Sequence, residues 1–158
     1  MSKTISENLT ILLAEDDKGH AALLKRNLWR TCIDAQIIHF PDGQQLLTYL
    51  GGKSTQLEPF HPGRYIILLD IKMPGLSGTE VLSIVKKDPE LRKIPVIMLT
   101  TTNNPHEIEL CYQEGCSFYI VKPSDYVKFM EAIESLGAFL SLPTLLIPEI
   151  KLPNSAAD

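Results

Sequence analysis

Short apolar runs alternate with amphipathic segments along almost the whole chain, and this alternation limits the possible folds more than any other feature. Apolar runs that alternate with helical patterns are typical of βα units and of a parallel sheet. In an open parallel sheet the carboxyl ends of the strands meet at one edge, where such folds bind their ligands. Four of the runs end in polar side chains, namely the acidic triplet Glu15-Asp16-Asp17, Asp70, Thr100 and Lys122. The sequence therefore predicts that acids, a hydroxyl and an amine share one site.

Periodicity and end signals predict five strands and five helices in strict alternation. The expected strands cover residues 9–14, 35–40, 65–69, 94–99 and 117–121, and the expected helices cover residues 18–31, 44–50, 78–87, 105–114 and 123–140. Ser77 and Asn104 are expected N-caps, Pro123 is expected to begin the last helix, and residues 51–64 are expected to form a surface loop. Right-handed crossovers leave few topologies for this number of units. We therefore predict an α/β fold, a flavodoxin-like (βα)5 doubly wound parallel sheet with strand order 2-1-3-4-5.

The chain of 158 residues is expected to fold as one domain. This domain spans residues 9–140 and follows an N-terminal extension at residues 1–8. A tail at residues 141–158 is apolar at first and then frayed, and it is too short to hold a further domain. The formal charge of −4 gives no basic footprint for nucleic acid, and no apolar run is long enough to cross a membrane. Three cysteines, an odd number, argue against a disulfide framework and for a reducing cytoplasm.

The predicted site has the composition of a metal-assisted phosphoryl acceptor. Neighbouring strands lie about 4.8 Å apart, so Asp16 and Asp70 can share one divalent ion, with Glu15 beside them. A backbone carbonyl just after Asp70, that of Lys72, would add a further ligand. Oxygen ligands of this kind favour Mg²⁺ over Zn²⁺. The ion would neutralise the acids, so that the Asp70 carboxylate can act as a nucleophile toward a phosphoryl group.

Lys122 and Thr100 complete this chemistry, because the ammonium can pair with one phosphoryl oxygen and the hydroxyl with another. Asp17 is interpreted as the N-cap of the first helix rather than as a ligand. Each of these residues alone has an ordinary explanation as a helix cap or a solvated loop residue. Together, at the ends of successive strands, they favour a common site.

Four segments resemble the receiver domain of two-component response regulators, the CheY-like family. The segments are Ile-Leu-Leu-Ala-Glu15-Asp16-Asp17 with the acidic pair, Leu-Leu-Asp70-Ile-Lys-Met-Pro-Gly with the phosphoacceptor, Ile-Met-Leu-Thr100-Thr101 with the switch hydroxyl, and Tyr119-Ile-Val-Lys122-Pro123 with the lysine. The resemblance runs from about residue 9 to about residue 140.

This resemblance implies that a sensor histidine kinase, or a phosphotransfer protein, donates a phosphoryl group from phosphohistidine to Asp70, with Mg²⁺ as the cofactor. The protein would catalyse only its own phosphorylation and dephosphorylation and would not otherwise be an enzyme. Thr100 would follow the phosphoryl oxygen and Tyr119 would turn inward behind it. The surface of the fourth helix, fifth strand and fifth helix would then change its affinity for a partner. The resemblance also implies a cis peptide bond between Lys122 and Pro123.

Three side chains near the acceptor are expected to tune its reactivity. Thr101 stands where the family usually has a smaller residue, and it would narrow access to the phosphoryl group. Lys72 and Thr102 occupy positions where side chains influence the water that hydrolyses the acyl phosphate.

The long loop and the tail resemble those of small stand-alone regulators that pair with bacterial and cyanobacterial phytochrome histidine kinases. In such regulators the last helix and the tail support a homodimer. The apolar tail could equally fold back on its own domain, and the sequence leaves both arrangements open.

Two other functions compete with a phosphorylated switch. A phosphatase of the haloacid-dehalogenase type also uses a strand-end aspartate with Mg²⁺, but it needs a second aspartate two positions later, where this chain has Lys72. A pseudo-receiver would bind partners without being phosphorylated. The presence of Asp70, Thr100 and Lys122 together argues against that alternative.

Overall fold

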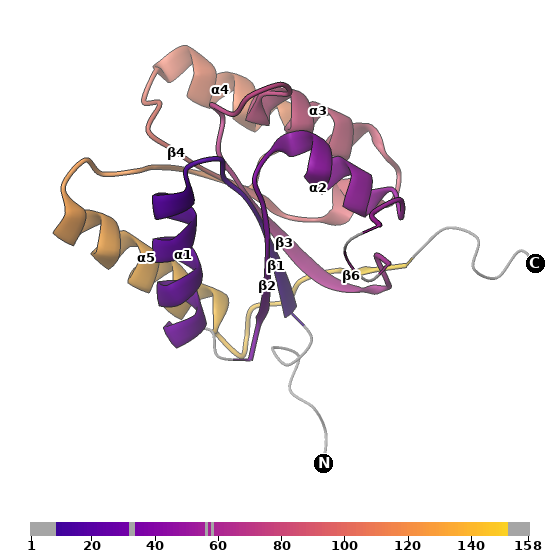
Figure 1. Ribbon diagram of the computed structural model, residues 1–158, viewed down its shortest axis with the longest axis horizontal. Coiled ribbons are helices and arrows are strands. Elements are labelled where there is room, and N and C mark those ends of the chain that lie inside the picture. The colour runs from indigo at the N-terminus through magenta and orange to yellow at the C-terminus, as the bar shows by residue number, and fades with distance from the viewer. Residues whose placement is uncertain (1–8, 32–33, 56, 58, 152–158) are drawn as a thin grey trace, which may run out of the picture.

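A parallel sheet lies between two layers of helices in the computed structural model, which describes residues 9–31, 34–55, 57 and 59–151 (Figure 1). The parallel strands are β1 (Leu9–Ala14), β2 (Gln36–Phe40), β3 (Gly63–Leu69), β4 (Val96–Thr100) and β5 (Phe118–Val121). The helices are α1 (Lys18–Thr31), α2 (Gly43–Leu50), α3 (Gly78–Lys87), α4 (Pro105–Glu114) and α5 (Tyr126–Leu140), with a short 3-10 helix η2 (Leu91–Lys93). The strand order β2-β1-β3-β4-β5 confirms the predicted flavodoxin-like topology.

Each face of the sheet has its own helices and its own core. α1 and α5 pack on one face, and α2, α3 and α4 cover the other (Figure 1). The central strand β3 contributes to both cores, because Ile66 and Leu68 join the cluster under α1 and α5 while Ile67 and Leu69 join the other. Burying such side chains is worth about 1.5–3 kcal/mol each. The strand that ends at Asp70 is therefore held from both faces.

Helices α3 and α4 begin at the N-caps that the sequence predicts. The Oγ of Ser77 accepts a hydrogen bond from the N–H of Glu80, and the Oδ1 of Asn104 accepts one from the N–H of His106. The last helix, however, begins at Tyr126 and not at Pro123. The preceding residue, Asp125, accepts a hydrogen bond from the N–H of Lys128 at 3.0 Å. A carboxylate cap satisfies a free N–H of the first turn, and this interaction places the helix start after the proline.

The long loop before β3 is anchored by an aromatic side chain. Phe60 is buried between Tyr49 of α2 and Tyr65 of β3, with ring centroids 5.6 Å and 4.8 Å away. β3 begins at Gly63, so the loop is slightly shorter than the predicted 51–64. Residues 56 and 58 lie outside the part of the chain that the structure describes.

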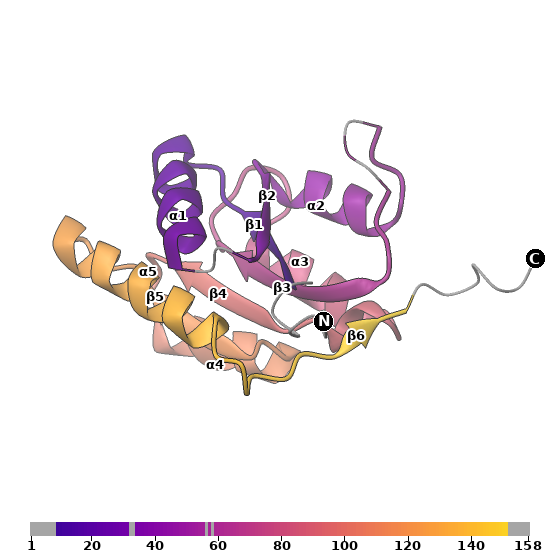
Figure 2. The ribbon, with the colours of Figure 1, turned by 90° about the horizontal axis from the view of Figure 1, so that it is seen from below.

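The tail folds back on its own domain as far as Lys151. Glu149 and Ile150 form a sixth strand, β6, which pairs antiparallel with Arg64 and Gly63 at the start of β3 (Figure 2). Ile150 is fully buried, and the N–H of Lys151 donates to a carboxylate oxygen of Glu90 at 2.7 Å. This strand was not predicted. The extension at residues 1–8 and the part of the tail that was predicted to be frayed lie outside the described residues.

β6 has room to pair because β3 begins earlier than its neighbour. The first pair between β3 and β4 is Ile67 with Val96, so the first residues of β3 have a free edge on that side.

Within the described residues, no helix is both long enough and apolar enough to cross a lipid bilayer.

Candidate functional site

The register of the central strands brings the predicted acids together. β1 and β3 pair with Ala14 opposite Leu69, so the residues that follow, Glu15 and Asp70, leave the sheet side by side. The N–H of Asp70 donates to the carbonyl of Ala14 at 3.1 Å. One carboxylate oxygen from each of Glu15, Asp16 and Asp70 lies within 4.8 Å of the other two. The three predicted acids therefore form one cluster.

Lys122 reaches this cluster from the end of β5, as predicted. Its Nζ contacts a carboxylate oxygen of Glu15 and lies 3.2 Å from Oδ2 of Asp70. The side chains of Lys122 and Glu15 are only 2% and 1% exposed. Buried charges of this kind require partners of opposite sign. The ammonium therefore compensates the two carboxylates that lie deepest in the site.

The pKa values of the two carboxyl groups shift in opposite directions. Burial raises the pKa of Glu15 to about 8, and its hydrogen bond with Asp70 adds to the rise. Burial also acts to raise the pKa of Asp70, but the hydrogen bond with Glu15 and the charge of Lys122 hold it below its ordinary value. Of the two carboxyl groups, Glu15 is therefore the one that holds a proton more readily. Asp70 stays ionised, which is the form that a nucleophile requires.

Thr100 and Tyr119 lie on the β4 side of the site. Thr100 is fully buried at the end of β4, and a hydrogen bond with its side chain helps to lower the pKa of Asp70. Tyr119 is half-buried, and its hydroxyl donates to the carbonyl of Thr102 at 2.7 Å. Burial raises the pKa of Tyr119 to about 12, so the phenol remains a donor. The aromatic ring thus already lies inward in this structure.

The three predicted tuning residues differ in their exposure to solvent. Lys72 and Thr101 are exposed at the rim, and the N–H of Lys72 is 3.4 Å from a carboxylate oxygen of Asp70. Thr102 is half-buried, and its hydroxyl oxygen has no hydrogen-bond partner among the described residues. Their effect on hydrolysis and the use of the Lys72 carbonyl as a ligand stay predictions.

Comparison with known proteins identifies the family. The model of the response regulator receiver domain matches residues 11–134. The chain belongs to this family. Response regulator Rcp1 of Synechocystis is 32% identical over 148 residues, which cover 94% of this chain and 99% of Rcp1. The family predicted from the four strand-end motifs is therefore confirmed.

Solved structures of receivers share the fold over most of the chain. A receiver domain from Rhodospirillum rubrum superposes with a TM-score of 0.79 at 38% identity, covering 90% of this chain and 99% of that one. The Mn²⁺-bound form of Rcp1 gives 0.77 at 29% identity, with 88% and 98% covered. The phosphorylated cyanobacterial phytochrome response regulator RcpA gives 0.76 at 28% identity, with 88% and 97% covered. The likeness to phytochrome response regulators is thus confirmed.

Receiver domains bind Mg²⁺ or Mn²⁺ through an acidic cluster, and the donor set of this receiver fits such an ion. Glu15, Asp16 and Asp70 offer oxygen atoms, which hard divalent cations prefer. The Oε2 of Glu15 is buried and has no hydrogen-bond partner within the described part of the chain. An oxygen left without a partner in this position suits a cation or one of its water ligands.

The peptide bond between Lys122 and Pro123 is trans, against the prediction of a cis bond. No cis peptide bond occurs among the described residues. The prediction came from the family resemblance alone. The trans form of a bond before proline is the more stable one by about 0.5–1 kcal/mol.

The sequence analysis missed His20. Its Nδ1 lies 3.3 Å from Nζ of Lys122 and 3.4 Å from a carboxylate oxygen of Glu15. The backbone N–H of His20 donates to a carboxylate oxygen of Asp17, the predicted cap of α1. Its ring packs against Phe129 of α5. The sequence does contain one signal for His20. It lies in the first turn of the helix that follows the acidic triplet, and this turn starts at the site.

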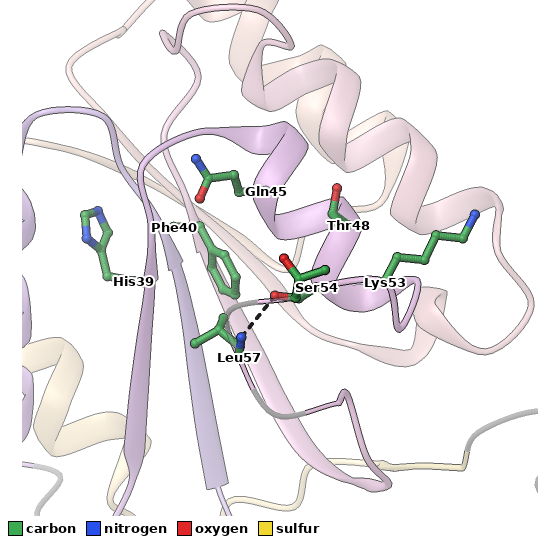
Figure 3. A pocket seen from close by; sticks show the side chains of 8 residues that line it. His39, Phe40, Gln45, Thr48, Lys53, Ser54 and Leu57 are labelled. Atoms are coloured by element: carbon green, nitrogen blue, oxygen red, sulfur yellow. Dashed lines mark hydrogen bonds between the residues drawn. The ribbon is translucent and has the colours of Figure 1, made fainter.

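His39 was missed as well. It leaves β2 on the side opposite to Phe40, and both residues line a cavity of about 340 Å³ (Figure 3). On its own side, Nε2 of His39 is 2.7 Å from the backbone carbonyl of Glu15. The N–H of Glu15 in turn donates to the carbonyl of Phe40 at 3.1 Å. The backbone that carries the acidic pair is therefore held at Glu15 by a side chain and by the backbone of the end of β2.

Gly78 allows the loop after Asp70 to turn back closely. A Cβ atom at this position would lie 2.1 Å from the carbonyl oxygen of Asp70. The N–H of Gly78 donates to the carbonyl of Ile71 at 2.8 Å. The first turn of α3 therefore packs directly against the backbone of the acceptor, which is a reason for glycine in that motif.

Proposed function

We propose that this receiver is a two-component response regulator that accepts a phosphoryl group from a phosphohistidine onto Asp70. The observation that carries the proposal is an aspartate at the end of the central strand, beside two other acids and a buried lysine. An oxygen of Asp70 attacks phosphorus as the bond from phosphorus to the histidine nitrogen breaks. The products are an acyl phosphate on Asp70 and a neutral histidine in the donor. The imidazole ring that leaves phosphorus takes up a proton if it does not already carry one.

The chain supplies charge and position for this transfer. Glu15, Asp16 and Asp70, with the backbone carbonyl of Lys72, would hold Mg²⁺. When bound, Mg²⁺ neutralises the acids and offsets the charge of the transferred group. The Lys122 ammonium would pair with one phosphoryl oxygen, in exchange for its present contact with Asp70.

A sensor histidine kinase, or a phosphotransfer protein, would be the donor. The likeness to Rcp1 and RcpA over almost the whole chain supports a phytochrome histidine kinase as that partner. We place the protein in the cytoplasm, in keeping with the free thiols of Cys111 and Cys116. The receiver would have no catalytic activity beyond its own phosphorylation and dephosphorylation.

Phosphorylation would change the affinity of the face formed by α4, β5 and α5 for a partner. Thr100 would move toward the phosphoryl oxygen and favour the inward position of Tyr119, biasing an equilibrium between two states. Side chains of β5 and α5 are exposed and apolar, as an association surface requires; these are Phe118, Val121, Tyr126, Val127 and Phe139. This surface, with the tail, is our candidate for a partner site or a homodimer.

Intact-mass measurement with acetyl phosphate tests the proposal. The wild type should gain one phosphoryl mass with Mg²⁺ and none in EDTA. Asp70→Asn should gain none, whereas the control Asp34→Asn, an exposed position outside the site, should behave as the wild type. Size-exclusion chromatography with beryllofluoride and Mg²⁺ then shows whether the switch changes the oligomeric state.

The competing function is a pseudo-receiver that binds partners without phosphorylation. If the wild type gains no phosphoryl mass with Mg²⁺ from acetyl phosphate or a phosphorylated kinase, that function replaces ours. If Asp70→Asn gains the mass as readily as the wild type, the acceptor is a different residue.

A further inference from the structure

Helix α1 has a charge opposite to that of the chain. Its basic residues are Lys18, Lys25, Arg26 and Arg30, and it contains no acid, although the chain has a formal charge of −4. All four side chains are exposed. None of them belongs to an ion pair within the described residues, where the pairs are made by His20, Lys93 and Lys122. These cations are therefore available to an external anionic group.

An exposed aromatic residue and a hollow lie among these cations. Trp29, the only tryptophan of the chain, is 60% exposed. Beside it a hollow of about 390 Å³ opens between α1 and the start of β2. It is lined by Lys25, Arg26, Trp29, Ala35, Gln36 and Ile37. Its floor is mostly apolar and its rim carries two cations, so it offers space for an apolar side chain flanked by acids.

The hollow is remote from the phosphoryl acceptor. α1 begins next to the acidic triplet and runs away from it, toward the opposite edge of the sheet (Figure 1). Trp29 comes eleven residues after Lys18, which is about 16 Å along a helix at a rise of about 1.5 Å per residue. A partner seated at Trp29 would therefore leave the edge around Asp70 open.

We propose that this surface, formed by Lys25, Arg26, Trp29, Arg30 and the start of β2, docks an acidic amphipathic helix of a protein partner. An apolar side chain of that helix fills the hollow and stacks on Trp29, and its acids meet the cations at the rim. Buried aromatic and arginine side chains are the residues that most often dominate binding energy at interfaces. Opposite charge around them favours rapid and selective association.

Charge complementarity favours a short acidic helix over other anionic partners. The cations occupy one helix, whose N-terminal end is bordered by Asp16 and Asp17. A nucleic acid or a vesicle presents an extended anionic surface that would meet these acids as well as the cations. A single helix can contact the hollow and its rim without approaching the acidic triplet.

The fluorescence of Trp29 provides a direct test. The probe is a blocked synthetic peptide of about 16 residues, long enough to form a helix, with leucines on one face and glutamates on the other. Titration should shift the Trp29 emission to shorter wavelength with saturation, as the indole leaves water. Anisotropy of a labelled peptide measures the same affinity without relying on the tryptophan.

Matched charge reversals separate this surface from the overall charge. Lys25→Glu with Arg26→Glu should weaken peptide binding about tenfold or more, because two rim cations become acids. Lys53→Glu with Lys87→Glu, two exposed lysines outside α1, changes the net charge equally and should leave affinity within about twofold. Circular dichroism checks the fold of both variants, and phosphoryl uptake from acetyl phosphate should be unchanged in both.

Three results would overturn the proposal. The first is no saturable binding of the peptide to the wild type. The second is equal weakening by the two pairs of reversals, which would mean non-specific attraction. The third is that vesicles of phosphatidylglycerol, or a DNA duplex of about 20 base pairs, shift the emission at lower concentration than the peptide does. In that case the surface belongs to a membrane or a nucleic acid.

Discussion

Replacing Lys122 by methionine isolates the electrostatic contribution of the buried ammonium. The two side chains are similar in length, and that of Lys122 is only 2% exposed, but methionine has no charge. In the wild type Nζ of Lys122 contacts Glu15 and lies 3.2 Å from Asp70. The substitution therefore leaves two neighbouring carboxyl groups without their cation, and it disturbs the packing little.

The expected loss of stability depends on pH. Removing one partner of a buried ion pair costs about 3–5 kcal/mol. Glu15 can reduce this cost by holding a proton, since its pKa is raised to about 8. Because the pKa of Glu15 is higher in the folded than in the unfolded protein, its protonation stabilises the fold. This contribution to the free energy of unfolding is fully present at low pH and is lost as the pH rises through about 8. At pH 9 we expect the full loss for Lys122→Met, and at pH 6 roughly half of it.

Urea denaturation in EDTA, followed by circular dichroism at pH 6 and pH 9, measures both quantities. With ordinary denaturant slopes the midpoint should fall by more than about 1 M at pH 9. Lys93→Met is the control, because Nζ of Lys93 lies 2.8 Å from Glu90 but the lysine is 44% exposed, so solvent screens the pair. The reasoning is refuted if the two variants lose the same stability, or if the loss for Lys122→Met does not change with pH.

Further predictions concern the metal, the backbone and a thiol. Mg²⁺ affinity should rise from pH 6 to about pH 8, where Glu15 loses its proton, and calorimetric titrations that give a constant affinity would contradict this. Gly78→Ala should cost about 1–3 kcal/mol in urea denaturation, because its Cβ would meet the carbonyl of Asp70; an unchanged midpoint would show that the loop yields freely. His39→Phe removes the hydrogen bond to the Glu15 carbonyl, so phosphoryl uptake, measured by mass spectrometry, should be slower while the fold persists. Uptake at the wild-type rate would show that His39 has no role in the site. Burial raises the pKa of Cys111 to about 11, so peptide mapping should find it alkylated by iodoacetamide only after unfolding.

The acidic cluster could be predicted because strand ends and strand order are both readable in the sequence. Apolar runs mark where β1, β3, β4 and β5 end, and their order then places Asp70 beside Glu15. Nothing comparable points to His39. Its partner is a backbone carbonyl on another strand, and a histidine within a strand pattern gives no sign of which group it will meet. The contact depends on the pairing of β2 with β1.

Two of the departures from the predicted secondary structure have identifiable physical causes. β6 is too short to show a period, and it exists because β3 begins before β4 and leaves an edge to be covered. The start of α5 was predicted from Pro123 alone. The structure begins the helix after Asp125, whose side chain satisfies a backbone N–H.

The antiparallel β6 determines the direction in which anything attached to the chain would leave the domain. α5 ends at Leu140 on the face shared with α1, but the following residues cross to the start of β3 and to Glu90, on the other side of the sheet (Figures 1 and 2). A fluorescent reporter or an effector joined after Lys151 would therefore project away from the α5 surface and leave it free for a partner. A fusion made directly after Leu140 would instead remove β6, uncover the edge of β3 and place its cargo against that surface. Reporter fusions meant to follow the switch should accordingly retain the chain through Lys151.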